Sequence, residues 1–188
     1  MRIIAGEARG RSILAPKGQH TRPTQDYVRE SLFNIIQRDV PDAVVLDLFS
    51  GSGALALEAL SRGAKRAVLA DKSRQAVECI RRNAETLRFT EQTLIVQGDW
   101  QTVLERLSDI SFDLVFLDPP YQLPQYRQMT DALESRGLLK RDALIVIEHA
   151  KNVTPDVSKS FRLRDERTYG DTAIHLYYFN AGGSTDGH

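Results

Sequence analysis

The 188-residue sequence has a single cysteine and no long apolar run. One cysteine, Cys79, cannot form an internal disulfide, which fits a reducing cytoplasm, and its helical neighbours favour a place in the core. No apolar stretch approaches the roughly 18 residues that a membrane-spanning helix needs. The first residues lack the apolar stretch of a signal peptide. We therefore expect a cytoplasmic protein that does not enter a membrane.

Metal-ligand spacing is also absent, because no pair of cysteine or histidine residues stands at the separations typical of zinc sites. We therefore expect no bound metal. His149 follows a predicted strand and His175 alternates with apolar residues, so we expect both to be structural. The sequence also contains no internal repeat.

Net charge is absent as well, with 25 basic and 25 acidic residues, but the charges are unevenly distributed. Residues 1–38 hold seven basic against three acidic side chains, so this segment carries +4 and the remainder −4. The basic residues are Arg2, Arg9, Arg11, Lys17, Arg22, Arg29 and Arg38. A basic segment on a neutral protein suits a phosphate-backbone partner such as a nucleic acid. The alternative is an ordinary solvated surface.

Length and composition predict one globular unit of ordinary size, with 41% hydrophobic and 27% charged residues. Within it, residues 1–38 are predicted to form a small β-hairpin over 2–14, a loop over 15–23 and a helix over 26–37. Residues 39–180 form the main α/β domain. Residues 181–188 are expected to be a disordered tail.

Strands and helices alternate through most of the main domain. The predicted strands are 44–48, 67–70, 93–97, 112–117 and 143–147, and the predicted helices are 54–62, 74–88, 101–107 and 125–136. Such alternation implies parallel strands joined by right-handed crossovers. The segments 161–167 and 173–179 differ, because the intervening Tyr169-Gly170-Asp171 predicts an antiparallel hairpin at the edge of the sheet.

The four residues Asp118-Pro119-Pro120-Tyr121 follow a predicted buried strand, where open α/β sheets place their chemistry. Two prolines fix two φ angles and stiffen the loop. The motif offers a carboxylate, backbone carbonyls and an aromatic face, which together could hold a planar amine. The alternative is a stiff loop without chemistry.

A tight glycine loop follows the first strand, and Gly51-x-Gly53-x-x-Ala56 fits the dinucleotide-binding spacing. Alone this signal is weak. Asp71 ends the next strand, 18 residues after Gly53, where an acid commonly binds a ribose hydroxyl, although it could instead cap a helix. Asp99 follows the third strand and could accept from an adenine amino group, or serve as a turn or N-cap residue.

Acidic residues therefore recur at the ends of consecutive strands, namely Asp47, Asp71, Asp99 and Asp118. A pyrophosphate prefers a helix N-terminus without nearby acids, which argues against NAD. S-adenosylmethionine carries an ammonium and a sulfonium and no phosphate. The acidic rim therefore favours S-adenosylmethionine as the cofactor.

The chain resembles the class I S-adenosylmethionine-dependent methyltransferases, and more narrowly the bacterial 16S rRNA (guanine-N2)-methyltransferase family. The resemblance covers about residues 1–179 and is carried by Arg2–Gly6, Arg9–Arg11, Arg22–Thr24, Val28–Asn34, Leu46–Leu55, Glu58–Ala64 and Asp118–Tyr121. One departure is Asp71, where the family often has Glu; either acid can serve a ribose. The resemblance implies a Rossmann-like fold with a seven-stranded, mostly parallel sheet and an antiparallel C-terminal strand.

The resemblance also implies site residues. We expect the cofactor to contact Asp47, Phe49, Gly51, Gly53, Asp71, Lys72, Asp99, Trp100 and Asp118. We expect Asp118, Pro119, Pro120 and Tyr121 to carry catalysis, and Arg22, Thr24, Arg29 and Tyr121 to bind the substrate. Asp118 and the Pro119 carbonyl would accept hydrogen bonds from the amine, and Tyr121 would stack on the base. Arg29 could instead pair with Asp26 or Glu30, and Trp100 could cover the adenine or pack locally.

The expected reaction is methyl transfer to the N2 amine of a guanine in 16S ribosomal RNA. Alternatives are another planar amine, such as adenine N6 or a protein glutamine, and a non-catalytic factor that binds ribosomal RNA. The expected partner is ribosomal RNA within an assembled or partly assembled small subunit, bound by a monomer. The target base must be unpaired or flipped out of a helix.

Overall fold

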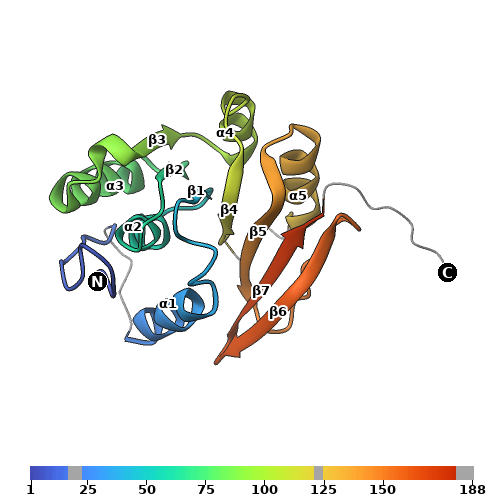
Figure 1. The fold of residues 1–188 in the computed structure, drawn as a ribbon, viewed down its shortest axis with the longest axis horizontal. Coiled ribbons are helices and arrows are strands. Elements are labelled where there is room, and N and C mark those ends of the chain that lie inside the picture. Colours follow the sequence, from blue (N-terminus) through green and yellow to red (C-terminus); the bar gives the residue numbers. More distant parts are fainter. Residues whose placement is uncertain (17–22, 121–124, 181–188) are drawn as a thin grey trace.

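The structure, a computed structural model, describes residues 1–16, 23–120 and 125–180, with only the backbone for residues 23–25. Its centre is a seven-stranded sheet with the strand order β3-β2-β1-β4-β5-β7-β6 (Figure 1). The strands are β1 (Val44–Asp47), β2 (Arg66–Asp71), β3 (Thr93–Gln97), β4 (Phe112–Leu117), β5 (Leu139–Ala150), β6 (Phe161–Tyr169) and β7 (Thr172–Phe179). The first five are parallel, and β7 runs antiparallel to β5 and β6. The predicted fold class is confirmed.

Helices cover both faces of the sheet. They are α1 (Pro23–Ile35), α2 (Ala54–Ser61), α3 (Arg74–Leu87), α4 (Trp100–Arg106) and α5 (Tyr126–Ser135), with a short 3-10 turn at Thr90–Gln92. Apolar residues of α1, α2 and α3 share one core cluster with one face of the strands. Those of α4 and α5 share a second cluster with the other face. No helix in the described part of the chain is long and apolar enough to cross a membrane.

Most predicted elements agree with the structure to within three residues, and 93–97 and 112–117 have the observed bounds. The strand predicted over 143–147 is longer, because β5 begins at Leu139. Its polar start hides it from a search for apolar runs. The pairing of β4 with β5 shifts register between Phe112 and Leu114, and Asp142 takes a φ of 60°, so the added residues form an irregular entry to the strand.

The hairpin predicted over residues 2–14 is wrong in one respect, because this segment contains a single antiparallel bridge, Arg2 to Ser12, and no strand. Some of its backbone donors bond to α2 instead, while others, such as the Ile3 N–H to the Arg11 carbonyl, bond within the segment. The N–H groups of Ile4 and Ala5 donate to the Glu58 carboxylate at 2.8 and 3.0 Å. The chain does fold back on itself, with Ile13 N–H donating to the Met1 carbonyl.

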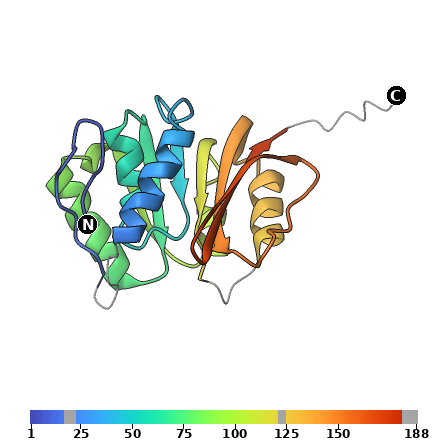
Figure 2. The same ribbon diagram turned by 90° about the horizontal axis from the view of Figure 1, so that it is seen from below.

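Gly6 explains how closely the N-terminal segment, residues 1–14, approaches α2. Its φ is +83°, and a Cβ built there would lie 1.8 Å from the Ser61 carbonyl oxygen. No other residue type fits this position without moving the segment. Figures 1 and 2 both show α1 between this segment and the β6–β7 hairpin.

The C-terminal hairpin forms as predicted, with β6 at the edge of the sheet and a turn at Gly170, whose φ is +60°. His149 on β5 and His175 on β7 are buried, and their ring nitrogens lie 2.5 Å apart, which fits a structural role. The predicted disordered tail, 181–188, lies outside the described residues.

Candidate active site

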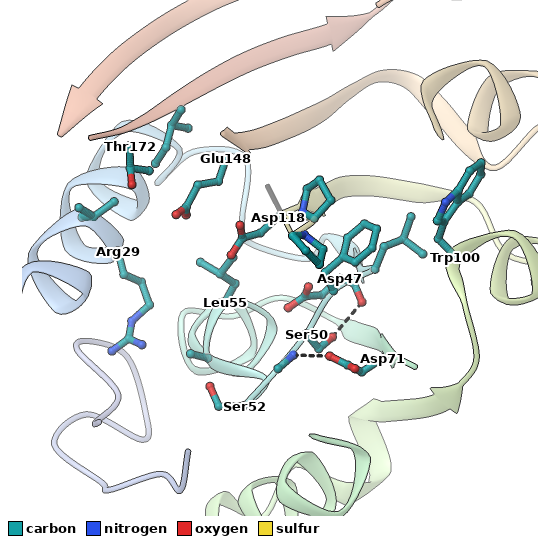
Figure 3. Close-up of a pocket in the computed structure, with 18 of the residues that line it drawn as sticks. Arg29, Asp47, Ser50, Ser52, Leu55, Asp71, Trp100, Asp118, Glu148 and Thr172 are labelled. Carbon is teal, nitrogen blue, oxygen red and sulfur yellow. Dashed lines mark hydrogen bonds between the residues drawn. The ribbon is translucent and has the colours of Figure 1, made fainter. Parts of the chain in front are cut away.

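A cavity of about 1060 Å³ opens at the carboxyl edge of the parallel strands. Its lining comes from the loops after β1, β2, β3 and β4, from α1, and from the β6–β7 turn (Figure 3). All four acidic residues of the predicted rim line it, namely Asp47, Asp71, Asp99 and Asp118. Parallel strands that end at one edge bring these residues together, although they are far apart in sequence.

The glycine loop after β1 is tied to the end of β2. The Gly51 N–H donates to Asp71 Oδ2 at 2.9 Å, and the Ser50 N–H donates to the Ala70 carbonyl. Gly51 lines the cavity, and its contact with the cofactor stays a prediction. Gly53 does not line the cavity; a Cβ built there would lie 3.0 Å from Leu69 and 3.1 Å from Leu57. Its role in this structure is to let α2 pack closely against β2.

The second and third acids of the rim also hold local structure. Asp71 Oδ1 accepts from the Ser73 N–H, so its carboxylate joins the glycine loop to the start of α3. Asp99 is the N-cap of α4 and accepts from the Thr102 N–H at 2.9 Å, and this bond lowers its pKa. The N-cap alternative is therefore observed for Asp99, whereas the N-cap of α3 is Ser73 and not Asp71. Both acids still line the cavity.

Trp100 and Lys72 flank these acids. Trp100 is 7% exposed, belongs to the core beneath α4 and also lines the cavity, so packing locally and facing the ligand space are compatible. Its Nε1 donates to Gln125 Oε1 at 3.2 Å. Lys72 is exposed, and Phe49 is half-buried; both line the cavity.

Asp47 is the most deeply buried of the four rim acids. It is 1% exposed, and its Oδ1 has no hydrogen-bond partner among the described residues. Burial raises the pKa of this carboxyl to about 7; the charge of Asp71 adds to the rise, and the Phe49 N–H opposes it. A buried acceptor without a partner beside a cavity is a site for a ligand with a donor or a positive charge.

Asp118 stands next to a second carboxyl that the sequence reasoning missed, Glu148. Strand β4 pairs with β5 so that Leu117 faces Ile147, and the next position brings Asp118 beside Glu148. Both line the cavity, and Figure 3 shows their side chains adjacent. Burial and the charge of Glu148 raise the pKa of Asp118 well above its usual range.

Arg29 is predicted to bind the substrate, and it does line the cavity, but its guanidinium is engaged elsewhere. It donates to the Arg2 carbonyl and to Asp26 Oδ1, the latter at 3.1 Å, and it is 5% exposed. Figure 3 shows it pointing toward the N-terminal segment and away from Glu148. The alternative pairing with Asp26 is thus the observed one.

The remaining predicted residues are only partly covered. Pro119 and Pro120 line the cavity beside Asp118. Tyr121 and Arg22 lie outside the described residues, as does the side chain of Thr24, so their roles stay predictions. No cluster that could hold a metal occurs among the described residues.

The cavity therefore combines a long acidic wall with a stiff Asp-Pro-Pro loop. Its carboxylates accept hydrogen bonds and attract cations, and the Pro119 carbonyl adds an acceptor that no side chain supplies. Such a lining can hold a ligand with a positive charge next to a second ligand that donates N–H groups. Holding two ligands next to each other in this way fits a reaction between two bound molecules.

Comparison with known proteins supplies further evidence. A family model described as "Conserved hypothetical protein 95" matches residues 1–178. The ribosomal RNA small subunit methyltransferase D of Escherichia coli strain K12 is 35% identical over 187 residues, covering 99% of this chain and 93% of its own. The Haemophilus influenzae protein of the same name is 33% identical over 179 residues, covering 94% of this chain and 93% of its own.

Solved structures agree with these relatives. The Escherichia coli protein yhhF superposes with a TM-score of 0.87 at 37% sequence identity, covering 97% of this chain and 99% of its own. A Thermus thermophilus protein superposes with a TM-score of 0.77 at 28% identity, covering 94% of this chain and 98% of its own. The likeness therefore extends over the N-terminal segment as well as the sheet.

Proposed function

The chain belongs to the family described as "Conserved hypothetical protein 95", and on that premise we propose that it is an rRNA (guanine-N2)-methyltransferase. It transfers a methyl group from S-adenosylmethionine to the exocyclic N2 amine of a guanine in 16S ribosomal RNA. The relatives named as small-subunit rRNA methyltransferases support ribosomal RNA as the substrate. The observation that carries the chemistry is the placement of Asp118 and Pro119 in the same cavity as Asp47, whose Oδ1 has no hydrogen-bond partner among the described residues.

The cavity suits S-adenosylmethionine because its described lining has more acids than bases. Asp71 would hold the ribose, Asp99 the adenine amine, and Asp47 the positive end of the molecule. The cofactor, when bound, supplies an electrophilic methyl group. Asp47 Oδ1 then gains the partner that it otherwise lacks, which offsets the cost of burying a carboxylate.

The amine is held by acceptors at the end of β4. A guanine N2 lone pair is delocalised into the ring, so the nitrogen is a poor nucleophile. Asp118 and the Pro119 carbonyl accept hydrogen bonds from its two hydrogens and fix its orientation. Positioning supplies most of the acceleration, since holding reactants in line removes a large entropic cost. Stacking of Tyr121 on the base would add about 1–3 kcal/mol.

The RNA partner would contact residues 1–38, which carry the excess of basic side chains. We propose that a monomer acts in the cytoplasm on an assembled or partly assembled small subunit. With so compact a chain, ribosomal proteins already bound to the RNA would help to present the base. Residues 39–180 form the methyltransferase domain in this proposal.

The test is transfer of labelled methyl groups from S-adenosylmethionine to naked 16S RNA, immature subunits, mature subunits and DNA, followed by mapping of the labelled nucleotide. We expect label on a guanine of the small-subunit RNA. Label confined to DNA or protein would overturn the proposal in favour of another amine substrate. Binding of the cofactor without transfer to any substrate would instead indicate a non-catalytic RNA-binding factor.

The first variant is Asp118→Ala, which removes the acceptor for the amine. We expect loss of transfer with retention of thermal stability, and only a modest loss of cofactor affinity, because Asp118 is one of several residues expected to contact the cofactor. Asp131→Ala is the matched control, because Asp131 is an exposed aspartate on α5 that pairs, among the described residues, only with Arg127. Transfer by Asp118→Ala at a rate near that of the unsubstituted protein would refute the assigned role.

A further inference from the structure

Glu148 is a charged residue at the end of the apolar run Leu144–Ile147 in β5. On the neighbouring strand Asp118 takes the equivalent position, one step after the pair Leu117–Ile147. Adjacent strands lie about 4.8 Å apart, and equivalent positions point to the same face of a sheet. The two carboxyls therefore lie side by side in the lining of the cavity, as Figure 3 shows.

The described residues around Glu148 do not hold its carboxylate in place. Leu32, Leu55 and Ile174 line the space around it. It makes no hydrogen bond or ion pair with another residue that the structure describes, and the nearby Arg29 guanidinium points away. A half-buried carboxyl without a partner is unfavourable in the free protein, and a bound ligand with N–H donors would satisfy it.

The purine edges distinguish what such a pair can bind. Guanine presents two adjacent donors on its Watson–Crick edge, the N1–H and the N2 amine. Adenine presents an amine next to N1, which is an acceptor and has no hydrogen. Two neighbouring carboxylates match the guanine edge and are repelled by the lone pair of adenine N1.

We propose that Glu148 accepts a hydrogen bond from the guanine N1–H while Asp118 holds the N2 amine, so that Glu148 sets the choice of guanine over other amino-purines. The inference rests on the proposed function and adds a specificity-determining residue to it. It also explains why Asp118 and Glu148 lie next to each other in the lining of the cavity. A site built to accept from a substrate N–H discriminates strongly against an analogue that lacks it.

The experiment compares RNA that carries guanine at the mapped position with RNA that carries 2,6-diaminopurine there. The analogue keeps the N2 amine but has an acceptor in place of the N1–H. We expect the unsubstituted protein to prefer guanine by about 10–100-fold in kcat/KM, the range of one good base contact. In Glu148→Gln, the amide can donate to the analogue, so the preference should vanish or reverse.

Two further variants separate recognition from folding. Glu148→Asp keeps the charge, so it should retain the preference for guanine at a lower rate. Glu166→Gln is the matched control on β6, because Glu166 contacts His175 on the opposite face of the sheet, and it should behave as the unsubstituted protein. Thermal stability and cofactor binding establish that each variant is folded.

The outcomes are distinct. An unchanged preference in Glu148→Gln, with guanine still methylated, overturns the role of Glu148 and leaves the proposed function standing. Failure of the unsubstituted protein to methylate guanine overturns both. A loss of preference confined to Glu148→Gln, with Glu148→Asp and Glu166→Gln still selective, supports the inference.

Discussion

At the scale of single residues, the buried Asp47 carboxylate lowers the stability of the ligand-free protein when it is ionised. Burial raises its pKa to about 7, so the folded chain keeps a proton there that the unfolded chain loses near pH 4. The unfolded state thus binds fewer protons between about pH 4 and 7. The contribution of Asp47 to stability therefore falls as pH rises through that window. Above pH 7 the protein carries a buried negative charge that suits a cationic ligand.

Asp47→Asn should raise the melting temperature of the ligand-free protein, and more at pH 8 than at pH 5, because only the higher pH ionises the native residue. Each 1 kcal/mol corresponds to about 2–4 °C for a domain of this size. The same variant should bind S-adenosylmethionine more weakly. The affinity of the unsubstituted protein should rise above pH 7, where Asp47 is ionised, and the variant should lack this rise. Thermal melts and calorimetric titrations at both pH values measure these effects. A variant that is less stable at pH 8 would contradict the argument.

The paired carboxyls predict the acid limb of the pH profile. Burial raises the pKa of Glu148, and burial together with the charge of Glu148 raises that of Asp118, so kcat/KM should fall at a higher pH than for ordinary carboxyls. The two groups titrate as a pair. In Glu148→Gln the mutual repulsion is gone, so the limb should move to lower pH. Rates measured across the acid range, with Glu166→Gln as control, test this; an unmoved limb would rule out the coupling.

At the scale of elements, helix α2 anchors the N-terminal segment through one buried side chain. Glu58 is 0% exposed and accepts from the Ile4 and Ala5 N–H groups and from Arg62 Nε at 2.7 Å. Arg29 Nε lies 4.0 Å from it. The carboxylate therefore links α2, α1 and the N-terminal segment, whose Met1 reaches the cavity wall.

Glu58→Ala should destabilise the protein by about 3–5 kcal/mol, because the Ile4 and Ala5 N–H groups and the half-buried Arg62 guanidinium lose their acceptor. Glu78→Ala is the matched control; Glu78 also pairs with an arginine four residues away, Arg74, but both side chains are exposed. That change should cost about 0.5 kcal/mol or less. Urea denaturation measures both. Equal losses in the two variants would show that the buried network contributes nothing special.

The sequence could predict the elements that depend on local residue patterns, but not those that depend on contacts with distant residues. Strands 93–97 and 112–117 were predictable because apolar β-formers stand between turn residues. The lack of regular strands over 2–14 was not, because the Ile4 and Ala5 N–H groups bond to Glu58, which lies more than 50 positions away. A local pattern carries no trace of such a partner.

The candidate site divides in the same way. The four rim acids were predictable because each stands at or just after a strand end, and the structure places all four around the cavity. Glu148 was missed, because it belongs to no motif and lies inside β5. Its signal was available as a charge that ends an apolar run. Gly53 is not in the cavity lining, and spacing alone does not separate a glycine that faces a ligand from one that faces Leu69.

At the scale of the whole molecule, acidic and basic side chains are concentrated in different regions. The strand ends provide an acidic cavity, whereas residues 1–38 carry an excess of basic side chains. Not all of these can reach a partner. Arg29 is buried, and Arg11 donates to carbonyls at the end of α3. Arg9 and Arg38 are exposed and make no ion pair with a described residue, so they are free to meet phosphates.

The double variant Arg9→Gln/Arg38→Gln should therefore bind small-subunit RNA more weakly and with a shallower dependence on salt. Each phosphate that the protein no longer neutralises lowers the slope of log K against log salt by about 0.7–0.9. Arg141→Gln/Arg162→Gln is the control, since both arginines are exposed but lie on β5 and β6. Affinities measured over a range of KCl concentrations should separate the pairs. If both double variants lower the slope equally, RNA is attracted by the protein as a whole, and residues 1–38 do not form a dedicated RNA-binding surface.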